Sequence, residues 1–433
     1  MKTKSSTLWL DANIEWIVAI SVMLITTFSV VGMCINSFFP IFKPIISILH
    51  PSIISLVCIY QYKHYGFRVL NNKFMVFFLI YSVYIFLYLT SWNVYRLENL
   101  HGAPTSLAQY FYSTIRLIAY LFCAETIARK LNARKFLLLS VLFCTIPSLL
   151  YINYVGVNFI QDYSNAYDEN YLGTLVLGYT NVPIMVLALV NHNKLIGSRK
   201  LSLILTAVIV VSISYILIVG TKRGPILWCL VNILICVYYM KRKVFKYLVI
   251  AIILIIVIYI YFDVIIDTIS SFAPQSAERF KRAIYEQDTS HRLDMQDQNG
   301  SAFIIAFNQF LSSPLWGSYF RLITNSWLFK GHYPHNVFLE ILITMGLIGF
   351  IPFLFFVFTS IKNISKVFRM KYSTQSLTCL VLFLSVFLQL QTTATIVLNI
   401  KFWLFFYIMC ILDRLSLTPQ NKLKWSIQKH TLL

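Results

Sequence analysis

One short segment of this sequence brings together three side chains that could do chemistry. Residues 333–340 place His335, Asn336 and Glu340 at the start of a long apolar run, directly after the longest polar loop. A histidine can take up or hold a proton near neutral pH. Ionisable groups at a bilayer boundary usually mark a substrate or ion path. His335 or Asn336 could equally cap the helix that follows, so a structural role stays open.

A second candidate is the turn 220–225, which carries Lys222 and Arg223 between two apolar runs. Pro225 suits the first turn of a helix, where a missing N–H costs little. Helix N-termini carry free N–H groups and partial positive charge, which favour phosphate. The sequence therefore predicts an anion-binding turn at Arg223. The alternative is an arginine that extends to the membrane interface.

The remaining candidates are single charges. Glu340 lies about one turn inside its helix and needs a partner such as Arg116, so both are read either as substrate-binding residues or as a structural ion pair. Arg292 and Arg321 belong to the long polar loop. We single out Arg292 as a functional candidate and Arg321 as a substrate-binding one, while most charges of this loop suit a solvated helix face.

The elements that position these residues are membrane helices. The chain is 58% hydrophobic and 12% charged, whereas a soluble domain carries about a quarter charged residues. Apolar runs recur at the length of about 20 residues that crosses a bilayer. We expect an all-α, polytopic protein forming one membrane domain over residues 1–433, with about twelve spans: 17–35, 41–60, 74–92, 107–127, 136–155, 174–192, 201–220, 226–240, 247–266, 337–360, 377–397 and 402–412.

The net charge of +20 is a signal of topology rather than of nucleic-acid binding. Twelve spans put both termini on one side, where most lysines and arginines then cluster. That side should be cytoplasmic. The long loop, about 267–334 between the ninth and tenth spans, then faces away from the cytoplasm. Its segments 276–285 and 303–311 are expected to form short helices.

No metal or other cofactor is expected. All eight cysteines fall in apolar segments without C-x-x-C spacing, and no Asp-x-Asp lies in a predicted outer loop. These patterns predict neither a zinc site nor a disulfide framework.

Three of these motifs resemble one family. His335-Asn336, nine residues and then Gly346-x-x-Gly349 is similar to the signature of the O-antigen ligase and polymerase superfamily of bacterial glycan-assembly enzymes. Lys222-Arg223-Gly224 resembles that family's Ser-Arg-Gly turn, with lysine in place of serine. Arg292 followed by the segment 313–317 (Ser-Pro-Leu-Trp-Gly) is similar to its arginine and Pro-Leu-x-Gly elements in the large periplasmic loop.

The resemblance implies a GT-C-like, metal-independent glycosyltransferase of the bacterial inner membrane. Its substrate would be a glycan on undecaprenyl diphosphate, handled at the periplasmic face. Arg223 and Arg292 would bind the lipid diphosphate, and His335 would orient or activate the acceptor. A chain-length regulator and a flippase are further candidate partners.

Three functions stay open. A polymerase transfers the growing glycan to a lipid-linked repeat unit. The sequence of residues 333–340 (Tyr-Pro-His-Asn-x-x-Leu-Glu) resembles polymerases somewhat more and favours this function. A ligase transfers the finished glycan to lipid A–core. A flippase or transporter would place its charged groups near the midplane, and Arg116, Pro147 and Pro183 are the features that favour it.

Overall fold

The computed structural model describes residues 3–38, 43–67, 73–91, 107–155, 169–192, 195–220, 223–239, 261–272, 274, 277, 281, 302–317, 336–370, 373–391, 396 and 399–416. All of its elements are helical. They are α1 (Thr3–Phe38), α2 (Lys43–Tyr65), α3 (Lys73–Ser91), α4 (Leu107–Phe122), α5 (Ala124–Lys130), α6 (Ala133–Ser140), the π-helix η4 (Val141–Thr145), α7 (Ile146–Val155), α8 (Glu169–Val190), α9 (Arg199–Gly220), α10 (Arg223–Tyr239), α12 (Phe262–Phe272), α15 (Ala302–Ser312), α17 (Val337–Met370), α18 (Thr374–Gln389) and α19 (Ile400–Ser416).

Helices occupy the positions that the apolar runs predict, apart from most of the ninth run, which lies outside the described residues. Within the described ranges, four helices are long and apolar enough to cross a membrane, and the α4–α5 pair, bent by 53°, would be a fifth. The predicted helix 303–311 is confirmed as α15. The predicted helix 276–285 lies outside the described residues except for Ala277 and Lys281. The number of membrane crossings stays a prediction.

Three predicted boundaries are wrong by eight residues or more, and one of them is the end of α17, at Met370 rather than at residue 360. Helix α1 begins at Thr3 rather than at residue 17, because its polar first half is held by ion pairs from Asp11 and Glu15 to neighbouring helices. Helix α18 ends at Gln389 rather than at residue 397. The polar residues Gln391, Thr392 and Thr393 follow one residue later, and a hydropathy average over a long window does not detect such an end.

The core is built around α19. Phe402, Trp403, Phe405 and Phe406 are all fully buried, and α19 packs against α17, α18, α4 and α5. The Trp403 ring lies 4.9 Å from the ring of Tyr81 on α3. A ring of aromatic contacts therefore fixes α3 and α17 to α19.

The outer faces of the bundle are apolar as well. Helices α3, α9 and α17 expose large aliphatic and aromatic side chains, among them Leu79, Val83, Val211, Ile351 and Phe358. A water-soluble protein rarely exposes apolar faces of this extent. Together with the long apolar helices, this surface indicates a helical membrane protein.

Ion pairs of the described helices gather at one end of the bundle, which we name the basic end. Among them are Lys63–Asp11 (2.8 Å), Lys135–Glu15 (2.8 Å), Arg129–Glu125 (3.0 Å) and Lys366–Asp413 (3.5 Å). Asp11 and Glu15 are one turn apart on α1. Arg129 also donates to the Leu415 carbonyl at 3.4 Å, next to Asp413. The basic end therefore joins the start of α1 to the ends of α2, α5, α17 and α19.

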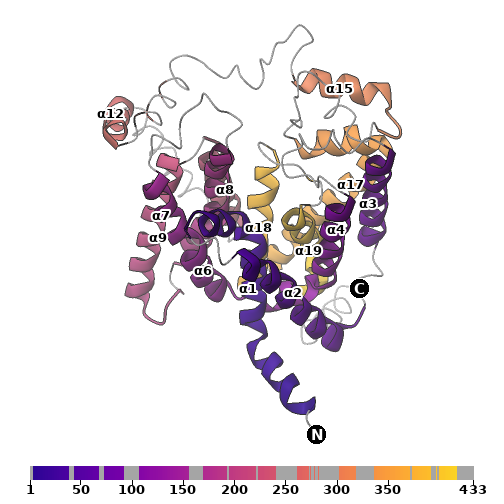
Figure 1. The fold of residues 1–433 in the computed structure, drawn as a ribbon, viewed down its shortest axis with the longest axis horizontal. Helices are drawn as coiled ribbons and strands as arrows, with labels where there is room; N and C mark the ends of the chain where they lie inside the picture. The colour runs from indigo at the N-terminus through magenta and orange to yellow at the C-terminus, as the bar shows by residue number, and fades with distance from the viewer. Residues whose placement is uncertain are drawn as a thin grey trace, which may run out of the picture.

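The opposite end of the bundle carries the starts of α10 and α19, and we name it the loop end. Figure 1 shows α15 far from the N-terminus, at this end of the molecule. Helix α19 begins at Ile400 and reaches the basic end at Asp413. Helix α10 finishes with the Tyr239 ring 5.3 Å from that of Phe368, beside the basic end. Its first residue, Arg223, is therefore about 24 Å away toward the loop end.

Candidate functional site

Helix α17 is broken at Gly346. This glycine has φ 59° and ψ −159°, a backbone conformation that is not helical and that is essentially restricted to glycine. The break divides α17 into a first arm, 337–345, and a second arm, 347–370. The Phe338 and Phe353 rings are 5.9 Å apart across the break. Because 15 residues of straight helix would span about 22 Å, the first arm must fold back toward the second.

The sequence predicted one uninterrupted membrane helix over 337–360, and this prediction is wrong. Hydropathy is high on both sides of Gly346, so the mean hydropathy of the segment does not reveal the break. The signal for the break is the glycine itself, Gly346.

The segment 313–317 that follows α15 docks into this break. The Leu347 N–H donates to the Pro314 carbonyl at 2.9 Å, and the Ile348 N–H donates to the Leu315 carbonyl at 3.2 Å. A helix break frees backbone N–H groups, and buried N–H groups need acceptors. The segment 313–317 supplies those acceptors.

Two glycines permit this contact. A Cβ at Gly317 (φ +75°) would lie 2.4 Å from the Thr344 carbonyl oxygen, and a Cβ at Gly346 would lie 2.4 Å from the Leu315 carbonyl oxygen. Both contacts are with backbone, which cannot move aside. The segments 313–317 and 346–349, which the sequence offered as separate motifs, therefore form one structural unit.

Asn336 caps the first arm of α17. Its Oδ1 accepts hydrogen bonds from the N–H groups of Phe338 and Leu339, both at 3.0 Å. The capping role left open by the sequence is thus observed. His335, its neighbour in sequence, lies outside the described residues.

Glu340 is buried, with 1% of its surface exposed. Its two carboxylate oxygens accept from the Ile396 N–H at 3.2 and 3.3 Å. The predicted pairing with Arg116 is wrong, since the ion pairs within the described ranges do not include it and Arg116 donates to His50 Nδ1 at 2.9 Å instead. Sequence reasoning matched the two charges by sign, without knowing which helices pack together.

Replacing Glu340 tests whether its carboxylate serves structure or chemistry. We expect Glu340→Ala to destabilise the protein by about 1–3 kcal/mol, because the buried Ile396 N–H loses its acceptor. Glu340→Gln keeps an acceptor oxygen and should unfold near the wild-type temperature. Thermal unfolding of the detergent-purified variants measures both effects. A Glu340→Gln variant that folds normally but has no activity would instead give the carboxylate a chemical role.

Arg223 is the first residue of α10. The Asn232 side chain donates to Ser385 Oγ at 2.8 Å, which ties α10 to the C-terminal half of α18. The Phe338 ring lies 6.0 Å from Phe387, also on that half of α18. The helix starts that carry Arg223 and Asn336 therefore lie toward the same end of α18.

The other site residues predicted from the sequence cannot be placed. The side chain of Arg223 and the whole of Lys222, Arg292 and Arg321 lie outside what the structure describes.

Lys401, at the start of α19, is a candidate that the sequence analysis missed. Its ammonium donates to the Thr26 carbonyl on α1 at 2.9 Å. The signal for it was a lysine in the first turn of an apolar helix, on the side expected to be poor in basic residues. It adds a positive group to the loop end, where α10 also begins.

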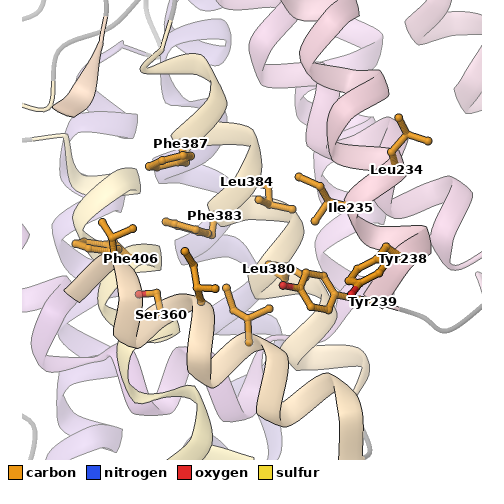
Figure 2. A pocket seen from close by; sticks show the side chains of 13 residues that line it. Leu234, Ile235, Tyr238, Tyr239, Ser360, Leu380, Phe383, Leu384, Phe387 and Phe406 are labelled. Carbon is orange, nitrogen blue, oxygen red and sulfur yellow. The ribbon is translucent and has the colours of Figure 1, made fainter. Parts of the chain in front are cut away.

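A cavity of about 500 Å³ lies between α10, α17, α18 and α19, lined almost wholly by carbon atoms (Figure 2). Along its walls Leu380 to Phe387 run upward on α18, while Leu234 to Tyr239 run downward on α10, so the two helices are antiparallel. Ser360 brings one of the few polar atoms to the lining. Such a cavity suits hydrocarbon, and carboxylates, lysines, arginines and histidines are absent from the described residues that line it.

No protein-family model matches the sequence, and the comparison with curated proteins gives no match either. The functional reading therefore depends on the residues and on their arrangement.

Proposed function

We propose that this protein is a membrane glycosyltransferase that polymerises a surface polysaccharide, such as O-antigen. It would transfer a glycan from undecaprenyl diphosphate to a lipid-linked repeat unit. The observation that supports this most is the docking of the segment 313–317 onto the break at Gly346. Two elements of the family's motif order meet there, and the arm that they anchor begins at Asn336, next to His335.

The proposed reaction needs little beyond these side chains. The acceptor hydroxyl attacks the anomeric carbon of the donor sugar, the bond from that carbon to the diphosphate oxygen breaks, and the lipid diphosphate leaves. His335 takes the proton of the hydroxyl. Arg223 and Arg292 pair with the phosphate oxygens, where the planar guanidinium binds bidentately. Stabilisation of that kind counts for more at a water-poor membrane edge than in bulk water.

We further propose that the chain has twelve spans in the bacterial inner membrane, with both termini cytoplasmic. The basic end supports this orientation, since Lys63, Arg129, Lys135 and Lys366 gather there. The side rich in lysine and arginine is the cytoplasmic one. The loop end, with Asn336 and the start of α10, would then face the periplasm.

A transfer assay with purified protein tests the proposal. The protein is mixed with a repeat unit on undecaprenyl diphosphate, and the lipid-linked products are separated by length. We expect a ladder of products that grow by whole repeats, without added metal. Absence of any elongation with a panel of repeat units would contradict the polymerase.

The same assay separates the two family functions. A ligase would leave lipid-linked length unchanged and would transfer the glycan only when lipid A–core is added. That result would replace polymerisation by ligation while keeping the proposed site.

A further inference from the structure

Arg116 lies on a chain of neutral polar groups. Its Nη2 donates to His50 Nδ1 at 2.9 Å. Arginine can only donate, so Nδ1 carries no proton and Nε2 carries one. That N–H donates to Tyr120 Oη at 2.6 Å, and Ser21 Oγ lies 3.2 Å from the same oxygen. The chain links α4 to α2 and α1 but offers no negative charge.

The guanidinium has no carboxylate partner in the part of the chain that the structure describes, and its Nε is buried without a hydrogen-bond partner. Arg129 has similar aromatic surroundings but differs from Arg116 in having a carboxylate partner within the described residues. Its guanidinium lies over the Tyr65 ring at 5.6 Å, as that of Arg116 lies over Tyr112 at 5.3 Å. Arg129, however, is paired with Glu125 at 3.0 Å. A partly buried cation without an anion is costly, so an external anion would stabilise Arg116.

The surroundings of Arg116 indicate where that anion comes from. Large apolar side chains close to Arg116 and His50 in the sequence are exposed: Tyr112 and Ile115 on α4, and Ile48 on α2. Helical side chains tilt toward the helix N-terminus, which agrees with the guanidinium lying over Tyr112, one turn earlier. In a membrane protein an exposed apolar surface of this kind meets lipid, so an anion that reaches Arg116 from the side is the phosphate of a lipid drawn toward the protein.

We propose that Arg116, supported by His50 and Tyr112, binds the phosphate of a lipid that approaches laterally between α2 and α4. The planar guanidinium offers two parallel N–H donors to phosphate oxygens. The long side chain lets the charge rise toward the interface while its stem stays among apolar groups. This binding does not require that the protein transfer glycans.

Lipid retention by the purified protein tests this site. Wild type, Arg116→Gln and Arg116→Lys are incubated in detergent with polyprenyl diphosphate, phosphatidylglycerol, uncharged polyprenol or inorganic diphosphate. Native mass spectrometry then measures the bound fraction. We expect Arg116→Gln to bind at least one phosphate-bearing lipid about tenfold or more weakly than the wild type does, because charge-assisted hydrogen bonds to the phosphate are lost. Arg116→Lys should keep part of the binding.

Arg129→Gln is the matched control and should bind lipid as the wild type does. Equal binding by wild type and Arg116→Gln would overturn the site, as would an equal loss in Arg129→Gln. If inorganic diphosphate binds as tightly as the lipids, the site recognises phosphate alone, and the proposal that its ligand is a lipid is wrong. Because retention is measured without turnover, a protein that binds lipid but makes no polymer would contradict the proposed function alone.

Discussion

Gly346→Ala is expected to lower the thermal unfolding temperature and to abolish activity. The glycine adopts φ 59° and ψ −159°, a conformation that costs other residues about 1–3 kcal/mol. Its new Cβ would also lie 2.4 Å from the Leu315 carbonyl oxygen. The segment 313–317 must then move away, and the first arm of α17 loses the contact that orients Asn336. Thermal unfolding and the transfer assay measure the two effects.

Gly317→Ala should reproduce this loss, because its Cβ would meet the Thr344 carbonyl oxygen from the other side of the same contact. Gly197→Ala is the control, since no atom lies within 4 Å of its Cβ position. If Gly346→Ala has the same unfolding temperature and transfer rate as Gly197→Ala, the contact between the segment 313–317 and Gly346 does not orient the first arm of α17.

The sequence predicted most helix positions because long apolar runs can only be buried or lipid-facing helices. Breaks were harder to predict. Gly346 and the bend of 53° after Phe122 both lie within continuous apolar runs. The break at Gly346 depends on its backbone conformation and on the docked segment 313–317, and neither changes hydropathy.

The site was predictable in its motifs but not in its contacts. The spacing of Asn336 and Gly346 pointed to the start of α17, and the structure adds that the segment 313–317 closes the break. The partners of charged residues were not predictable, because they depend on which helices pack together. Arg116 contacts His50, and Lys401 contacts a backbone carbonyl on α1.

Arg223→Ala and His335→Ala are expected to lose nearly all transfer while folding normally. Removing one group that stabilises developing charge typically costs about 10²–10³ in rate. Arg223 is the first residue of α10, so its replacement leaves the helix and the Asn232–Ser385 contact intact. Arg223→Lys should recover only part of the rate, since lysine keeps the charge but not the bidentate geometry. Initial rates of repeat addition measure the effect.

The matched control is Arg199→Ala, which removes an exposed arginine from the first position of another apolar helix, α9. Its rate should equal that of the wild type. If the protein needs a cation at Arg223 to neutralise the leaving diphosphate, donors with a less charged leaving group should react at similar rates in wild type and Arg223→Ala. A uniform loss with every donor would mean that Arg223 holds the fold of the loop end rather than the phosphate, and the electrostatic mechanism would then be wrong.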